Sequence, residues 1–190
     1  MKTISLTKGK TALVDAIDHA YLIQFRWCYN SKGYCVHYWI DELGRKHTAS
    51  MHRWIMERML GHPIPCNLTV DHISRDRLDN RRSNLRLATR TQNQANKGVQ
   101  VNNTTGFKGV NWHSGKWETR IVFQGRKLYL GRHISPVAAA MVYDCAARLL
   151  YHEFAGCNFD SPAPPHIQQF VLDKLVSNQI PIDPQLLKSA

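Results

Sequence analysis

The stretch 68–97 restricts the fold of this chain more than any other part of the sequence. It opens with the apolar, β-branched run Leu68–Val70, which predicts a short strand. A polar loop follows over residues 74–83, and a second strand, in which apolar and charged residues alternate, begins at Asn84. A helix then starts at a threonine cap and ends before Gly98. The predicted order is strand, loop, strand and helix.

The polar residues of this stretch suit hydrolysis of a phosphodiester bond, which needs a base for water and a cation near the phosphate oxygens. His72 is the candidate base and Asp71 the candidate metal ligand, and the strand is expected to lose its regularity at this pair so that both reach one cleft. Asn84 could hold Nδ1–H of His72 and leave Nε2 free to act. Asn93 and Asn96 share a helix face and can add a ligand oxygen. Oxygen ligands favour Mg²⁺ or Mn²⁺ over Zn²⁺.

Each of these residue types also has an interpretation that involves no chemistry. An Asp-His pair can stabilise a turn, and Asn is common in turns. We keep the structural interpretation for Asp79 and Asn80, as loop and capping residues, and for His52, a single histidine on a predicted helix. The remaining positions together match one metal-site pattern, which favours a site there.

The charge of the chain favours a polyanionic partner. Its 25 Lys and Arg against 14 Asp and Glu give a net charge of +11. Residues 71–132 contain thirteen of the basic residues and four of the acidic ones, a net charge of +9. A general solvated surface mixes both signs more evenly, so we expect nucleic acid as the partner. Around the predicted cleft, Arg75, Arg86 and Arg90 are the candidate contacts to DNA.

Two further features bear on location and redox state. No apolar run is long enough to span a bilayer, and the N-terminus has no apolar core and cleavage site of a signal peptide. We therefore expect a cytoplasmic protein with no membrane partner. The five cysteines form no C-x-x-C pair, which predicts free thiols.

Residues 1–50 carry short alternating segments separated by turn residues, which predicts a small, mostly antiparallel sheet. The expected strands are Ile4–Leu6, Ala12–Val14, Phe25–Tyr29, Tyr34–Ile40 and Thr48–Met51. Met51–Leu60 follows as a helix that ends at Gly61.

A second folding unit begins after a polar linker over residues 99–105. Three strands are predicted, joined by two-residue turns that contain Gly, at Gly109–Trp112, Trp117–Phe123 and Arg126–Leu130. Ser135 and Pro136 mark the start of a helix whose apolar stripe should cover one face of this sheet. The stripe consists of Ala138, Met141, Val142, Cys145 and Leu149. After residue 160, His166–Ser177 could form one more amphipathic helix.

The other face of this sheet would carry a cationic, partly aromatic set, which we call the outer-face residues. They are Asn111, His113, Lys116, Arg120, Lys127 and Tyr129. A three-stranded sheet of this size and charge fits the major groove of duplex DNA.

The same central stretch resembles the ββα-metal motif of HNH endonucleases, in the form common among phage and intron-borne homing enzymes. The matching residues are Val70–Ile73, Asp79–Arg86 and Thr89–Asn96. The resemblance implies that His72 is the general base and that Asp71 and Asn93 bind the metal. It also implies that Asn84 holds the base, with Asn96 as the alternative ligand. The last ligand is Asn where many members have His, which disfavours transition metals.

The unit over residues 106–160 resembles the DNA-binding domain of the Apetala and ethylene-response-factor transcription regulators, also found fused to phage HNH nucleases. The matching residues are Phe107–Val110, Gly115–Trp117, Tyr129–Gly131, Ala139, Tyr143–Asp144, Ala146–Ala147 and Asn158–Phe159. The resemblance implies that Lys108 and the outer-face residues contact DNA. Several positions that are Arg in the family are Lys, Asn or His here, so the base preference does not carry over.

The sequence therefore predicts an α+β protein. A small N-terminal antiparallel sheet with a ββα-metal motif is followed by a three-stranded antiparallel sheet packed on one helix. The expected parts are an HNH nuclease domain (1–98), a linker (99–105), a DNA-binding domain (106–160) and a tail (161–190). We expect a homing-type endonuclease that uses Mg²⁺ or Mn²⁺ on double-stranded DNA, as monomer or homodimer, in a phage-infected bacterial host. The alternatives are a non-catalytic DNA-binding regulator with an inactive nuclease motif, and an RNA-directed nuclease.

Overall fold

The computed structural model describes residues 1–181, and its chain divides into two compact units, residues 1–90 and residues from 91 onward. Within the described residues, two sheets have two strands each and two have three, and all their strands pair antiparallel. This is the α+β class predicted from the sequence. The predicted nuclease domain extended to residue 98, whereas the compact units divide after Arg90.

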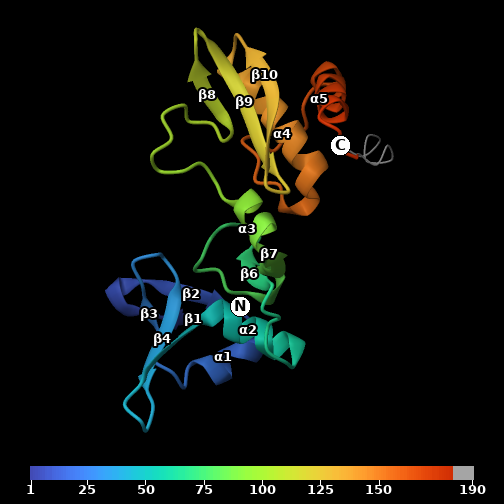
Figure 1. The fold of residues 1–190 in the computed structure, drawn as a ribbon. Coiled ribbons are helices and arrows are strands. Elements are labelled where there is room, and N and C mark those ends of the chain that lie inside the picture. The colour runs from blue at the N-terminus through green and yellow to red at the C-terminus, as the bar shows by residue number, and fades with distance from the viewer. Residues whose placement is uncertain (182–190) are drawn as a thin grey trace. The chain divides into compact units, whose positions relative to one another are not determined.

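The first unit combines short strands with two helices (Figure 1). In chain order its elements are β1 (Lys2–Ser5), β2 (Thr11–Val14), α1 (Ala16–Leu22), β3 (Cys28–Tyr29), β4 (Cys35–Ile40), β5 (Lys46–Ser50), α2 (Met51–Leu60), β6 (Leu68–His72) and β7 (Leu85–Thr89). Strand β1 pairs with β2, β4 lies between β3 and β5, and β6 pairs with β7. Helix α2 ends as predicted at Gly61, whose φ of 74° is the left-handed conformation of a glycine C-cap.

Helix α1 was missed by the sequence analysis. Its buried residues are Asp18 and Leu22, while Ile17 is exposed. A charged residue therefore stands on the buried side, and the apolar periodicity that marks an amphipathic helix is lost. Asp18 is compensated by hydrogen bonds from Arg82 (2.7 Å) and Arg58 (3.3 Å), which come from distant parts of the chain.

The core of the first unit places α2 beside the strand that carries the Asp-His pair. Val14, Leu22, Met51 and Ile55 are completely buried in this core, and Trp27 is nearly so. Helix α2 contacts β4, β5, β6 and β7. Side chains on the inner side of α2 are consequently held next to β6.

Strand β6 runs two residues further than predicted. The antiparallel register sets Asp71 opposite Arg86 and His72 opposite Leu85. The pairing continues past His72, since the backbone N–H of Ile73 donates to the carbonyl of Asn84 at 2.9 Å. The expected loss of regularity at the Asp-His pair was therefore wrong. Neighbouring residues of a regular strand point to opposite faces, so the two side chains leave β6 on different sides.

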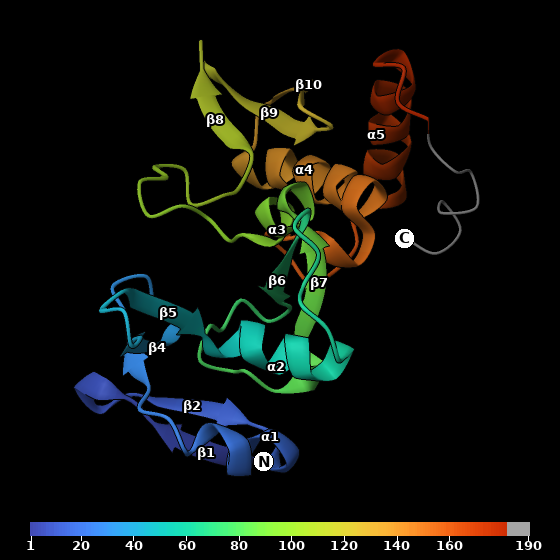
Figure 2. The ribbon, with the colours of Figure 1, turned by 60° about the horizontal axis from the view of Figure 1, so that its bottom comes forward.

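The second unit is built on one sheet and two longer helices. Its elements are α3 (Arg90–Asn96, whose first residue is the last of the first unit), β8 (Val110–His113), β9 (Lys116–Phe123), β10 (Arg126–His133), α4 (Pro136–Tyr151) and α5 (Pro165–Ser177). Strand β9 is central, α4 packs on the sheet, and α5 packs on α4 (Figures 1 and 2). The predicted strands and the sheet-on-helix arrangement are confirmed.

The two hairpin turns of the sheet and the start of α4 lie where the sequence predicted them. The two hairpin turns each contain two consecutive residues with positive φ, Ser114–Gly115 and Gln124–Gly125, as a type I′ turn requires. The side chain of Ser135 accepts a hydrogen bond from the backbone N–H of Ala138, and Pro136 is the first helical residue.

Helix α4 is buried over more than its predicted stripe. Val142, Cys145 and Leu149 are buried as predicted, but Ala138 and Met141 are only partly buried. The other buried residues are Ala139, Ala140, Tyr143, Asp144, Ala146, Ala147, Leu150 and Tyr151. The wider burial arises because α4 has the sheet on one side and α5 on another.

The predicted helix in the tail is confirmed as α5, which starts one residue before the predicted His166. The rest of the predicted tail, residues 182–190, lies outside the described residues. Among residues 1–181, no helix combines the length and apolar character that a membrane crossing requires.

Candidate functional site

Asp71 and His72 are both buried, each with 5% of its surface exposed, at the end of β6. On one side of the strand, the carboxylate of Asp71 pairs with Arg86 of β7. Nε of Arg86 donates to Oδ2 at 3.0 Å, and Nη2 makes an ionic contact with the same oxygen at 2.9 Å. Arg86 was a predicted DNA contact, and the structure gives its guanidinium group a carboxylate partner within the protein.

On the other side of the strand, the His72 ring lies among polar and aromatic groups. Its ring centre is 5.1 Å from that of His52 on α2 and 6.2 Å from that of Tyr34. Burial lowers the pKa of His72 below its ordinary value of 6.5, and the hydrogen bond with Asn80 and the nearby carboxylates reverse this only in part. The imidazole is therefore neutral at neutral pH, the form that a general base needs.

The side chain of Asn80 contacts Nε2 of His72, whereas the sequence analysis assigned Asn84 a contact with the other ring nitrogen, Nδ1. Oδ1 of Asn80 lies 3.3 Å from Nε2 of His72, and Asn80 is 1% exposed. The sequence predicts only a loop residue at Asn80, because Asn is common in turns. Its contact depends on how the loop folds back, which no local pattern encodes.

Asn84 closes the loop between β6 and β7. Its Oδ1 accepts from the backbone N–H of Ser74 at 2.9 Å, and its Nδ2 donates to the carbonyl of Asp79 at 2.7 Å. Both polar atoms of the side chain are thus engaged by the loop backbone. Instead of the expected bond to His72, the Asn84 side chain therefore bonds to two backbone groups of the loop, the N–H of Ser74 and the carbonyl of Asp79, which lie within its hydrogen-bonding distance.

His52 was set aside in the sequence analysis as a packing or surface residue. It is 9% exposed, and its Nδ1 is buried without a hydrogen-bond partner among residues 1–181. Burial lowers the pKa of His52 to about 3, with smaller contributions from His72 and Arg53. An unpaired buried nitrogen is costly for the folded state, which distinguishes His52 from an ordinary core residue. A single histidine on a helix gave no signal of this in the sequence.

The arginines in and near the loop between β6 and β7 differ in whether they have a partner within the protein. Arg81 is paired with Asp79 at 2.6 Å, and Arg77 stacks on the ring of Tyr34. Arg75 and Arg90 are exposed and make no ion pair within residues 1–181. Arg75 has a φ of 68°, which is uncommon for a residue with a side chain. Their contacts with DNA stay predictions.

The predicted ligands on α3 belong to the second unit. Asn93 is half-buried and Asn96 is buried. Within residues 1–181, no group of three or more His, Cys, Asp and Glu side chains converges to hold a metal. The assignment of Asn93 or Asn96 as a ligand stays a prediction.

Lys108 has a structural role in the second unit. Its ammonium group donates to the backbone oxygens of Ala95, Lys97 (2.6 Å) and Gly156 (3.1 Å). A side chain at Gly156 would place its Cβ 2.7 Å from the oxygen of Ala95, so the chain can approach α3 only with glycine there. Lys108 thereby joins the end of α3 to the loop after α4. Its predicted contact with DNA is untested.

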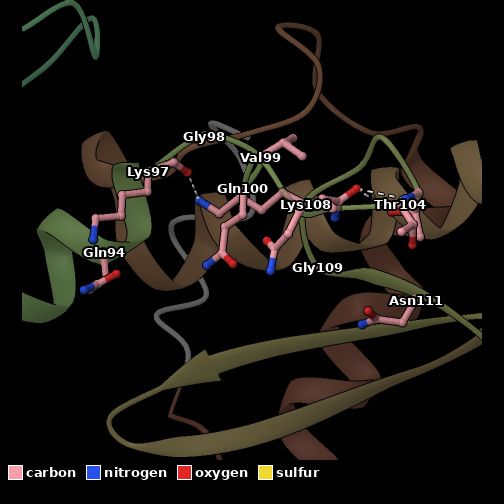
Figure 3. Close-up of a pocket in the computed structure, with 12 residues that line it drawn as sticks. Gln94, Lys97, Gly98, Val99, Gln100, Thr104, Lys108, Gly109 and Asn111 are labelled. Carbon is pink, nitrogen blue, oxygen red and sulfur yellow. Dashed lines mark hydrogen bonds between the residues drawn. The ribbon is translucent and has the colours of Figure 1, made fainter. Parts of the chain in front are cut away.

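A polar pocket of about 350 Å³ lies next to Lys108 (Figure 3). Its walls come from the end of α3, the predicted linker 99–105 and the start of β8. Asn103 organises this segment, since its Oδ1 accepts from the backbone N–H groups of Thr105 (2.9 Å) and Gly106 (2.7 Å). The segment between α3 and β8 is therefore a folded turn region held by side-chain bonds to the backbone.

The outer-face residues lie on one side of the sheet as strand alternation predicted. The register pairs Asn111 with Glu118, and Arg120 with Tyr129. Glu118 is buried on this side by ion pairs with Arg120 and Arg132, which neutralises part of the positive face. Trp112 was not among the predicted set, yet 57% of it is exposed on the edge strand β8.

The segment that carries these residues is similar to known proteins. Residues 49–95 match the family model described as HNH endonuclease, a segment that includes α2, β6 and β7. A protein of Acanthamoeba polyphaga mimivirus described as uncharacterized HNH endonuclease L560 is 32% identical over 152 residues, 80% of this chain and 76% of that protein. Protein 3.8 of Escherichia phage T7 is 33% identical over 67 residues, 34% of this chain and 55% of that protein.

The mimivirus alignment is longer than either compact unit, so it includes residues of both. The family model falls on the segment that carries Asp71, His72, Asn80 and Asn84. On the extent of this similarity, the chain belongs to the HNH endonuclease family.

Proposed function

We propose that this protein is a metal-dependent DNA endonuclease of homing type, which hydrolyses a phosphodiester bond in duplex DNA. The observation that carries the proposal is the neutral, buried imidazole of His72 at the end of β6. Its neighbour Asp71 leaves the strand on the other face, but the carboxylate is near enough for its charge to act on the His72 ring. A neutral imidazole can accept a proton from water, and an ionised carboxylate can hold a hard cation.

The residues present fit a divalent metal. Asp71 supplies a carboxylate oxygen, and Asn93, or Asn96, would supply an amide oxygen. Mg²⁺ binds through one or two carboxylates and keeps several waters, so the carboxylate of Asp71 with an amide oxygen would suit it. When bound, Mg²⁺ or Mn²⁺ would neutralise charge on the phosphate. In the protein itself, His72 accepts the proton of the attacking water and Arg86 holds the carboxylate of Asp71 in place.

The second unit is proposed to bind the duplex through the outer face of its sheet. The exposed side chains of Lys116, Lys127 and Tyr129 form a cationic, partly aromatic surface on one side of β9 and β10. The resemblance to the Apetala and ethylene-response-factor domain also supports DNA binding by this face of the sheet. Phosphate contacts by such residues would position the nuclease without cleaving DNA themselves.

The test is a cleavage assay on supercoiled plasmid with the full chain. Nicked or linear product is expected with Mg²⁺ or Mn²⁺ and none with EDTA. Competition with duplex RNA separates a DNA enzyme from an RNA-directed one, since only DNA should protect the plasmid.

A non-catalytic DNA-binding regulator is the second candidate. It is favoured by the ion pair that Arg86 makes with Asp71 and by the burial of His72, both of which limit access to the site. Retention of plasmid in a gel-shift assay with no nick at any metal concentration would establish the regulator and reject the enzyme.

A further inference from the structure

We infer that the first unit has a phosphate-binding surface of its own, formed where three turns from separate parts of the chain meet. We call it the three-turn surface, and its cations are Lys8, Lys10, Lys32, Arg75 and Arg77. The partner is the phosphate backbone of duplex DNA. The inference rests on the proposed function in so far as duplex DNA is the substrate, and it adds a DNA contact within the first unit to the one proposed for the second.

Side-chain contacts join the three turns. The turn between β1 and β2 lies against β3, and Oγ1 of Thr7 accepts a hydrogen bond from the backbone N–H of Tyr29 at 3.0 Å. From the same turn, Nζ of Lys10 lies 6.0 Å from the ring centre of Tyr29. The turn between β3 and β4 is bonded to the loop after β6, because Nη1 of Arg77 donates to the carbonyl of Lys32. The cations of the three turns therefore share one surface.

Gly33 lies at the junction of these turns. A Cβ atom there would be 3.5 Å from the hydroxyl oxygen of Tyr29 and 3.7 Å from Cδ and Nη1 of Arg77. On its other side, the guanidinium carbon of Arg77 lies 4.7 Å from the ring centre of Tyr34, and that ring is 6.2 Å from the ring of His72. The three-turn surface thus extends from the β1–β2 turn to the residues beside the proposed base.

The charge of this surface suits a polyanion. All five cations are exposed, and none makes an ion pair within residues 1–181. Asp76 is the one acidic residue in the three turns, and its Oδ1 accepts a hydrogen bond from the backbone N–H of Leu78 at 2.9 Å. Arg77 uses one of its five N–H groups on Lys32, which leaves a stacked guanidinium group with donors for phosphate oxygens.

Two of the cations have backbone conformations that favour glycine. Lys8 has a φ of 61° and Arg75 a φ of 68°, and no other residue with a side chain has a positive φ among residues 1–90, all of which the structure describes. Glycine or Asn would adopt this conformation at lower cost. Because neither side chain has an acidic partner within residues 1–181, we expect the compensating interaction to be made with a ligand.

The experiment is a gel-shift titration of the full chain on a short duplex DNA in EDTA, at several salt concentrations, so no cleavage is needed. Changing both Lys10 and Lys32 to Gln should reduce the slope of log Kd against log salt by about two. At about 0.1 M salt, the dissociation constant should rise at least about tenfold.

Changing both Lys2 and Lys46 to Gln is the matched control. It removes the same charge from the same two hairpins at the ends away from the three-turn surface, since Lys2 pairs with Val14 and Lys46 with Ile40. We expect its dissociation constant to stay within about threefold of that of the unmodified protein, and its salt slope to be unchanged.

Lys8→Asn tests the contribution of backbone strain. Asn tolerates the left-handed conformation and has no charge, so this variant should melt no lower than the unmodified protein and yet reduce the salt slope by about one. A structural role for Lys8 would have the opposite result, a lower melting temperature with an unchanged salt slope.

Two results would overturn the inference. One is an unchanged salt slope when Lys10 and Lys32 are both Gln, and the other is an equal loss of affinity in the control variant, which would reduce the effect to net charge. Plasmid that the unmodified protein leaves intact in Mg²⁺ and Mn²⁺ would instead reject the proposed endonuclease, while the salt slopes would still decide whether the three-turn surface binds DNA.

Discussion

Asp71 and Arg86 face each other across β6 and β7, with Nε of the arginine 3.0 Å from Oδ2 of the carboxylate. The ion pair is largely buried, since 13% of the Arg86 side chain and 6% of the Asp71 side chain are exposed. The residue proposed to bind a divalent cation thus has a positive partner in the protein. Metal binding and the ion pair act on the same carboxylate, so each should affect the other.

The first prediction concerns this coupling. Arg86→Gln removes a positive charge beside Asp71 and should lower the free energy of unfolding by about 3 kcal/mol in EDTA, as for a broken buried ion pair. Mg²⁺ should recover part of this loss because it supplies a new positive partner. Thermal unfolding with and without Mg²⁺ measures both effects. In Arg86→Gln combined with Asp71→Asn, the Mg²⁺ effect should vanish; an equal effect in both variants would contradict the assignment of Asp71.

The second prediction concerns the proposed base. His72→Ala should reduce the nicking rate by about 10² to 10⁴-fold, the usual contribution of a general base, while the dissociation constant for DNA stays within about twofold. Plasmid nicking and gel-shift titration provide the two numbers. Cys35→Ala, a buried neighbour outside the proposed chemistry, controls for damage to the core. Full activity in the His72 variant would remove its assigned role.

The third prediction follows from the low pKa of His52. The unfolded chain protonates this residue near pH 6.5, whereas the folded protein resists protonation until about pH 3. Between these values the unfolded state binds the additional proton. The free energy of unfolding should therefore fall as the pH falls, by about 1.4 kcal/mol per pH unit for this group.

His52→Leu removes the titrating imidazole, so the free energy of unfolding should fall less steeply as the pH falls. The remaining decline includes His72, whose lowered pKa acts with the same sign. Urea denaturation at several pH values between about 7 and 4 measures both slopes. Equal slopes for the two proteins would show that His52 is not held neutral by the fold.

The fourth prediction concerns Arg75, whose φ of 68° is favourable for glycine and unfavourable for most other residues. Arg75→Gly should raise the free energy of unfolding by up to about 1 kcal/mol and yet weaken DNA binding, with the salt slope reduced by about one. Arg75→Asn, which also tolerates this conformation, should reproduce the binding loss. A variant with an unchanged salt slope would place Arg75 outside the DNA interface.

The fifth prediction tests the outer face of the sheet. Lys116 and Lys127 are exposed, whereas Arg120 is engaged by Glu118. Changing both lysines to Gln should weaken binding to all DNA sequences and reduce the salt slope by about two, without affecting the structure. Lys46→Gln with Lys2→Gln, two exposed lysines of the first unit, is the matched control for charge. If both double variants lose the same affinity, the effect is one of net charge alone.

Local features of the sequence predicted most elements correctly. Gly61 ends α2 and Ser135 begins α4 because the capping chemistry depends on a few consecutive residues. The hairpin turns at Ser114–Gly115 and Gln124–Gly125 likewise depend on their own backbone preferences. Helix α1 was not predicted because Asp18, a charged residue, stands on its buried side. The arginines that neutralise Asp18 lie far along the chain, so no local pattern indicates them.

The sequence by itself determined the strand-loop-strand-helix order, the Asp71-His72 pair within it and the alternation of the outer-face residues, since these depend on neighbours in the chain. Only the tertiary structure decided that Asn80 rather than Asn84 contacts His72, that His52 lies against the same ring, and that Arg86 holds Asp71. These contacts exist because the loop is bonded to β2 and α2 is packed beside β6, which joins segments that no local preference relates.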